Sequence, residues 1–130
     1  MKLFLQIEIN QWQNASYEKP LLSFASSLSK DLVTAEIDNQ SDSAIVDMVI
    51  KLCNQADHIF VLVLAQPDQP LGSTLKLLHQ LLRNDQRIHT VILSGNHEPS
   101  ENLLRTLDQR FKKENDSEKI REWITGFALA

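Results

Sequence analysis

Three polar residues of this chain have side chains that could carry acid–base chemistry. His97 and Glu98 follow the apolar stretch 89–94, and Asp68 follows the apolar stretch 58–65. An imidazole oriented by a nearby carboxylate is a common arrangement for moving protons in enzymes. If the protein is an enzyme, we expect His97 to be the general acid or base, with Glu98 or Asp68 orienting it.

A second set of polar side chains could bind a small polar ligand through hydrogen bonds. They lie in or beside the segments that follow apolar stretches: Asn10, Trp12, Asp38, Asp42, Asp68, Ser73, Ser94 and Asn96. Loops are also polar because water solvates them, and the sequence leaves both interpretations open. Trp12 could stack on a ligand or anchor a partner, or it could pack over the edge of the sheet.

Residues 95–98, Gly-Asn-His-Glu, resemble the motif with which calcineurin-like metallophosphoesterases bind two metal ions. That family also uses an upstream Asp-x-His, a GDxxD segment and later histidines, and the chain contains none of these. His58 and His89 begin their strands, whereas His97 lies beyond a strand end about 20 Å away, so the three cannot share an ion. Segment 10–19 contains no glycine, and no GxxxxGK[ST] phosphate loop occurs. We therefore predict no metal site and no cofactor.

Residues 56–80 are similar to part of the nucleoside deoxyribosyltransferases and the TIR-like domains. The resemblance consists of an apolar strand after Ala-Asp, a polar loop, and Gly-Ser at the start of a helix. It implies a nucleotide-like ligand in the crevice at the carboxyl ends of the strands. In those families an acidic residue on the helix carries the glycosidic chemistry. Residues 71–76 contain no acid, which argues against that activity here.

The apolar pattern predicts the strands that would position these residues. Residues 58–65, HIFVLVLA, are apolar without alternation, which is typical of a strand covered by helices on both faces. Further strands are predicted at 2–9, 33–37 and 89–94, with helices between them. This order predicts an α/β fold of one domain spanning residues 1–130, with three layers (α/β/α). We expect a four-stranded parallel sheet in the order 2-1-3-4, a flavodoxin-like topology that lacks strand 5.

Helices are predicted wherever apolar residues recur every three or four positions. Pro20 suits the first turn of the first helix, and Ser41 or Asp42 can cap the second. A later helix is expected to extend through Phe111, because Leu103, Leu107 and Phe111 are spaced four residues apart. Ligands of open parallel sheets bind beyond the carboxyl ends of the strands, where the strand order reverses, so the polar loops should meet there.

Composition limits the partners. The chain has 17 acidic and 13 basic residues and a formal net charge of −4, and no basic stretch with interleaved aromatics occurs, so nucleic acid is not expected. No stretch approaches the roughly 20 apolar residues of a membrane span. The single cysteine excludes an internal disulfide. We expect a cytoplasmic protein without a membrane or nucleic-acid partner.

Two hypotheses about function follow. The first is a non-catalytic interaction or regulatory domain. It self-associates or binds a protein partner through Leu77 and Leu81, which widen the apolar stripe of their helix to about 160°. We expect these two side chains to lie outside the core of the monomer. The alternative is a binding protein or enzyme for a small polar metabolite, such as a nucleotide, in the crevice at the strand ends.

Overall fold

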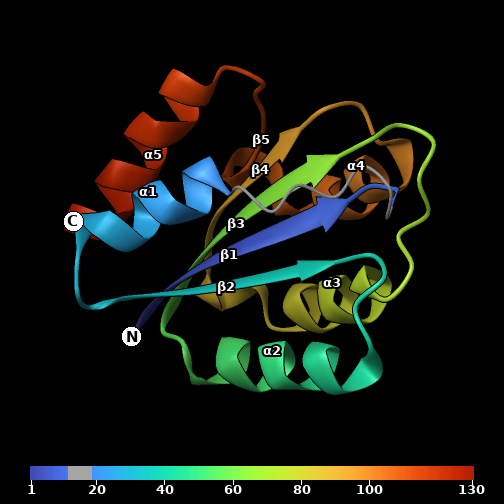
Figure 1. Ribbon diagram of the computed structural model, residues 1–130, viewed down its shortest axis with the longest axis horizontal. Helices are drawn as coiled ribbons and strands as arrows, with labels where there is room; N and C mark the ends of the chain where they lie inside the picture. The colour runs from blue at the N-terminus through green and yellow to red at the C-terminus, as the bar shows by residue number, and fades with distance from the viewer. Residues whose placement is uncertain (12–18) are drawn as a thin grey trace.

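Five parallel strands form one sheet in the computed structural model, which describes residues 1–11 and 19–130 (Figure 1). The strands lie in the order β2-β1-β3-β4-β5, and each neighbouring pair is parallel. Their bounds are β1 Lys2–Ile9, β2 Leu32–Asp38, β3 His58–Ala65, β4 Ile88–Ser94 and β5 Phe111–Lys113. The predicted α/β class, the parallel sheet and the order of the first four strands are confirmed.

The prediction of only four strands is wrong. The helix α4 (Glu98–Leu104) gives way to 3-10 turns (η3, Arg105–Arg110), and Asp108 adopts a φ of 52° that ends helical geometry. Phe111 then begins β5 and pairs with Val91 of β4. The sequence did not reveal β5 for two reasons. A strand of three residues is too short to show an alternating pattern, and the four-residue spacing of Leu103, Leu107 and Phe111 is typical of a helix. The complete order, 2-1-3-4-5, is that of flavodoxin-type doubly wound sheets.

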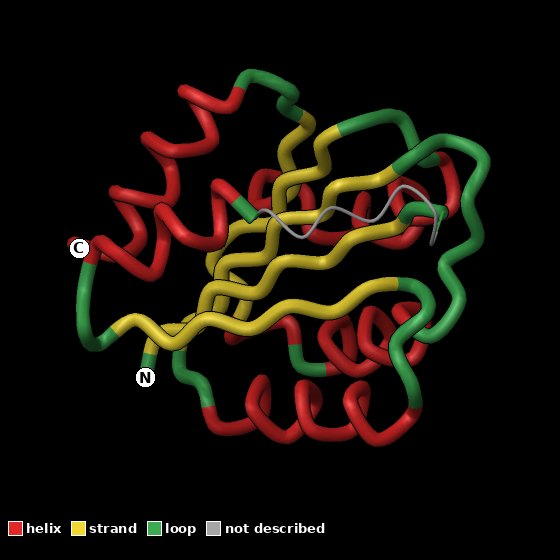
Figure 2. The backbone as a smooth tube through the Cα atoms, viewed as in Figure 1, coloured by secondary structure: helices red, strands yellow, loops and turns green. Residues whose placement is uncertain are grey.

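Helices cover both faces of the sheet, so the three predicted layers are present (Figure 2). On one face lie α1 (Pro20–Leu28) and α5 (Ser117–Leu129); on the other lie α2 (Ser43–Gln55), α3 (Thr74–Arg83) and α4. Side chains alternate between the two cores, so that Leu5 and Val61 pack toward α2 and α3 while Phe4 and Phe60 pack toward α1 and α5. Residues 59–63 of β3 are at most 1% exposed, as expected of a central strand.

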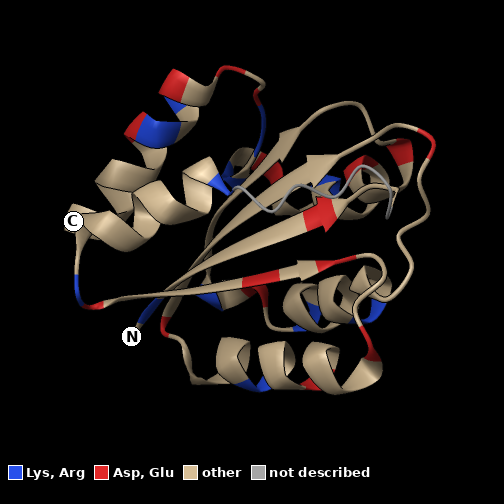
Figure 3. Ribbon diagram, viewed as in Figure 1, with Lys and Arg blue, Asp and Glu red and all other residues tan. Residues whose placement is uncertain are grey.

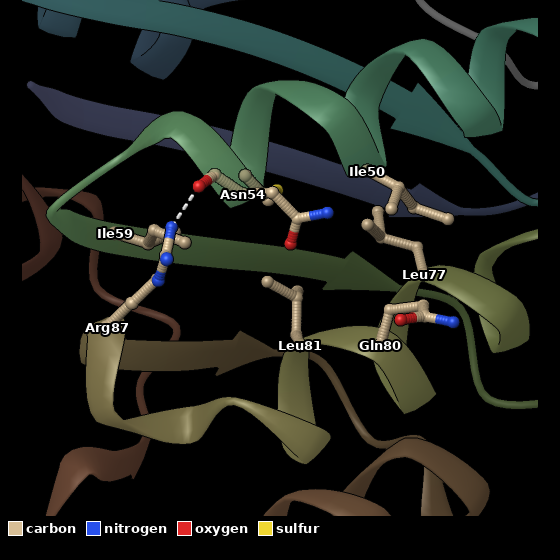
Figure 4. Close-up of a pocket in the computed structure, with 8 residues that line it drawn as sticks. Ile50, Asn54, Ile59, Leu77, Gln80, Leu81 and Arg87 are labelled. Atoms are coloured by element: carbon tan, nitrogen blue, oxygen red, sulfur yellow. Dashed lines mark hydrogen bonds between the residues drawn. The ribbon is translucent and has the colours of Figure 1, made fainter.

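The expectation that Leu77 and Leu81 lie outside the core is wrong. Leu77 is fully buried and Leu81 is 6% exposed, because α3 packs against α2 as well as against the sheet and needs a wide apolar stripe for both. Figure 4 shows the two leucines facing Ile50 and Ile59 from the α3 side. The cavity left between them is about 10 Å³, roughly the space of one water molecule.

None of the helices in the described part of the chain has the length and apolar character needed to cross a bilayer.

Candidate functional site

A polar cleft lies where β1, β3 and β4 end. The strand order reverses between β1 and β3, since β2 lies on the far side of β1, and this is where the topology places a ligand. The cleft has a volume of about 370 Å³, within the range of small-molecule sites. Leu64 and Ala65 form its apolar part, and its polar lining consists of Glu8, Asn10, Gln66, Ser94, Gly95 and Asn115.

One wall of the cleft is built around Asn115, which follows β5. Its Oδ1 accepts hydrogen bonds from the Gly95 amide at 2.7 Å and the Ser94 hydroxyl at 3.3 Å. The amide of Glu114 donates to the Leu93 carbonyl at 3.0 Å and so fixes this loop to β4. Sequence reasoning missed Asn115 because it missed β5, the strand that carries the loop to the cleft.

The opposite wall comes from the ends of β1 and β3. Glu8 forms an ion pair with Lys19 and is largely buried, with 13% of its side chain exposed. The backbone N–H of Asn10 donates to Asn39 Oδ1 at 3.3 Å. The backbone N–H of Gln66 donates to the Ile9 carbonyl at 2.8 Å. Their side chains border the cleft on a fixed backbone.

A buried side-chain amide lies on the same face of β1 as Glu8, two residues before it. Gln6 is 1% exposed, and its Oε1 has no hydrogen-bond partner among the described residues. The sequence placed Gln6 within the predicted strand 2–9 and gave no signal of this unpaired acceptor. The strand beneath the cleft therefore carries polar groups at two successive positions of one face, Gln6 and Glu8.

The acids and the serine near β2 serve local structure instead. Asp38 Oδ1 accepts from the Gln40 amide at 2.8 Å, and Asp42 Oδ1 accepts from the Ile45 amide at 3.0 Å and so caps α2. The Ser73 hydroxyl donates to the Asp38 carbonyl at 3.3 Å. Asp38 also borders a separate recess of about 230 Å³ that shares Glu8 with the main cleft. Asp42 and Ser73 line neither space.

The structure does not bring His97, Glu98 and Asp68 together as an acid–base group. His97 is 1% exposed and caps α4, since its Nδ1 accepts from the Ser100 amide at 3.2 Å. Its Nε2 lies 2.6 Å from the Gln69 carbonyl, which can only accept, so Nε2 carries the proton. Both ring nitrogens are thus occupied, while Glu98 and Asp68 are exposed.

We expect His97→Ala to destabilise the protein by about 2 kcal/mol, because it removes a helix cap and leaves the Gln69 carbonyl without its donor. Urea denaturation followed by circular dichroism measures this loss. His97→Asn is the matched variant, since asparagine caps helices well and should recover part of the loss. Equal stability of His97→Ala and the wild type would contradict the capping role.

Among the described residues, neither Asn96 nor Cys53 contributes to the cleft. Asn96 is exposed and does not line it, and Trp12 lies outside the described residues. Burial raises the pKa of the Cys53 thiol to about 12, so this thiol is protonated and unreactive at neutral pH. Within residues 1–11 and 19–130, no three His, Cys, Asp or Glu side chains gather closely enough to hold a metal ion.

Comparison with protein-family models, curated proteins and solved structures finds no match to this chain.

Proposed function

We propose that this protein is a non-catalytic, regulatory binding domain of the cytoplasm, and that its cleft takes a small uncharged ligand rich in hydroxyl groups, of the nucleoside class. The observation that carries the proposal is the convergence of amide, hydroxyl and carboxylate groups from three strand ends on one cleft: Asn10, Gln66, Asn115, Ser94 and Glu8. Amides and hydroxyls both donate and accept hydrogen bonds, which suits the hydroxyl groups of a sugar.

The charge of the cleft favours a nucleoside over a nucleotide. None of the described residues that line the cleft is Lys or Arg, and the lysine beside it, Lys19, is paired with Glu8. Acidic positions predominate around this edge of the sheet (Figure 3). A phosphate group placed here would find no unpaired Lys or Arg among the described lining residues to balance its charge, which weakens binding.

We propose that the protein is non-catalytic because its best acid–base candidate, His97, and its best nucleophile candidate, Cys53, are both buried. The imidazole of His97 is buried with both nitrogens hydrogen-bonded, and the thiol of Cys53 is buried in the core. A ligand bound in the cleft would meet amides, a hydroxyl and an ion-paired carboxylate. These groups orient a ligand rather than transform it.

Isothermal titration with adenosine and with adenosine 5′-monophosphate tests the proposal. We expect adenosine to bind, and the monophosphate to bind at least about tenfold more weakly because of its charge. Asn115→Asp keeps the oxygen that accepts from Gly95 but loses the amide donor, and should weaken adenosine binding roughly fivefold. Asn102→Asp makes the same change on the exposed part of α4 and should leave the affinity unchanged.

Two results would overturn the proposal. One is equal or tighter binding of the monophosphate. The other is an affinity for adenosine that Asn115→Asp lowers no more than Asn102→Asp does.

A protein-interaction function keeps one specific observation in its favour. Met48 and Ile45 are 70% and 42% exposed, and their spacing of three residues on α2 places both large apolar side chains on one face of the helix. We propose this face of α2, rather than the buried Leu77 and Leu81, as the surface for self-association. Met48→Glu should then convert a dimer to a monomer in sedimentation velocity. A wild-type protein that is monomeric at high concentration would exclude self-association.

A further inference from the structure

A second groove is lined by residues of α5, of β4 and β5, and of the 3-10 turns that precede β5. It shares no lining residue with the cleft described above. Thr90 lies near the amino end of β4, whereas Ser94 of the cleft is the last residue of that strand. The groove has a volume of about 450 Å³, which is enough for a ligand of amino-acid size.

The wall of the groove is aromatic. Trp123 and Phe127 come from successive turns of α5, and the His89 ring centroid lies 5.2 Å from that of Phe127. Partial burial, together with electrostatic interaction with His58 and Lys2, lowers the pKa of His89, which favours the uncharged imidazole at neutral pH. Aromatic surfaces of this kind bind flat apolar groups by offset stacking or edge contacts.

Two opposite charges, Lys112 and Glu122, border the same groove without forming an ion pair with another described residue. The ion pairs among the described residues include neither Lys112 nor Glu122. Lys112 Nζ lies 5.7 Å from the Trp123 ring centroid and donates to the Gln109 carbonyl at a long 3.4 Å. The guanidinium of Arg110, in contrast, is paired with Asp85 at 3.1 Å. One ammonium and one carboxylate therefore remain available to a ligand.

Gly126 keeps part of the groove open. A Cβ at this position would meet no atom within 4 Å, so alanine would fit without any rearrangement. Glycine inside a helix costs about 1 kcal/mol of stability relative to alanine. The chain thus carries a destabilising residue where its own packing does not require one, and the space this leaves lies along the groove.

From this arrangement we infer that the groove binds a free amino acid with an aromatic side chain. The ligand's carboxylate pairs with Lys112 and its ammonium with Glu122, and its ring packs against Trp123 beside Gly126. The opposite charges of a zwitterion can pair with Lys112 and Glu122, and an aromatic side chain can stack on the ring of Trp123. The site is independent of the nucleoside cleft, because the two share no residue.

Titration of the ¹⁵N-labelled protein with L-phenylalanine, followed by NMR, tests the inference. We expect saturable shifts of the Trp123 indole N–H and of the amides of Thr90 and Gly126. Two probes keep the ring but lose one charge: phenethylamine lacks the carboxylate, and 3-phenylpropionate lacks the ammonium. Each should bind at least about threefold more weakly than phenylalanine, the value of a partly exposed ion pair.

Variants separate the groove from the rest of the molecule. Gly126→Leu should abolish binding by filling the groove, whereas Gly126→Ala should be at least as stable as the wild type and verifies that a side chain is tolerated. Lys112→Gln should weaken phenylalanine binding by about threefold, and Lys119→Gln, on the exposed part of α5, should not. The inference is wrong if phenylalanine shifts none of these resonances at millimolar concentration. It is equally wrong if Gly126→Leu binds normally, or if either singly charged probe binds as tightly.

Discussion

Gly95→Ala is expected to destabilise the protein by at least about 3 kcal/mol, although it adds only one methyl group. The backbone at Gly95 has a φ of 97°, a region that residues with a Cβ avoid. A Cβ built there would lie 2.2 Å from the carbonyl oxygen of Ala65, at the end of the neighbouring strand. That oxygen belongs to the backbone and cannot turn aside, so the ends of β3 and β4 would have to separate.

Gly126→Ala is the matched control, since it adds the same methyl group in a helix where nothing lies within 4 Å. It should raise the free energy of unfolding by up to about 1 kcal/mol. Chemical denaturation of both variants beside the wild type measures the difference. If Gly95→Ala were as stable as Gly126→Ala, the close approach of β4 to Ala65, and with it the shape of the cleft, would be wrong.

Phe60→Ala is expected to cost about 3–5 kcal/mol, the usual range for truncating a fully buried aromatic side chain. Phe60 is 0% exposed in the middle of β3. Its ring lies 5.7 Å from Phe4 on the adjacent strand and 5.5 Å from Phe127 on α5, measured between centroids. The substitution would therefore open a cavity where sheet and helix meet, and it would remove two aromatic contacts.

Phe24→Ala provides the comparison for that variant. Phe24 is half-buried on α1, and its ring faces the Arg121 guanidinium at 5.5 Å. The Phe24→Ala substitution removes less buried surface than Phe60→Ala does, so urea denaturation should show that it lowers the free energy of unfolding by less than about 2 kcal/mol. A Phe60→Ala variant that lost no more stability than Phe24→Ala would mean that β3 does not lie at the centre of the sheet.

The sequence was most informative where burial is strongest. Residues 58–65 are continuously apolar, which predicted a strand covered on both faces, and β3 has those bounds. Pro20 was expected in the first turn of its helix, and α1 begins there. Asp42 was one of two residues expected to cap the second helix, and it caps α2. These predictions rest on local chemistry, which a single sequence displays directly.

The parts that the sequence did not reveal depend on contacts between distant segments. Leu77 and Leu81 looked like excess apolar surface because the packing of α3 against α2 cannot be read from either helix alone. β5 is only three residues long and is defined by its pairing with β4. Asn115 enters the cleft only through β5, and its distance from Gly95 along the chain gave no signal of their hydrogen bond.

His97 illustrates how a residue type suited to catalysis can have a structural role. Its position after a strand and before a glutamate predicted acid–base chemistry, yet its imidazole joins the start of α4 to the loop that follows β3. The sequence contained the correct signal as well. A polar residue three positions before Ser100 and directly before Glu98 and Pro99 is the pattern of a helix cap. Only the geometry separates these two roles.

The most direct test of the central claim, that the strand ends form the ligand site, is an NMR titration of the wild-type ¹⁵N-labelled protein with adenosine. We expect the backbone amides of Gln66, Gly95 and Asn115 to shift together along one binding curve, while that of Gly126 in the second groove stays in place. Shifts confined to the second groove or to α2, or no shift at any amide of the cleft, would contradict the account.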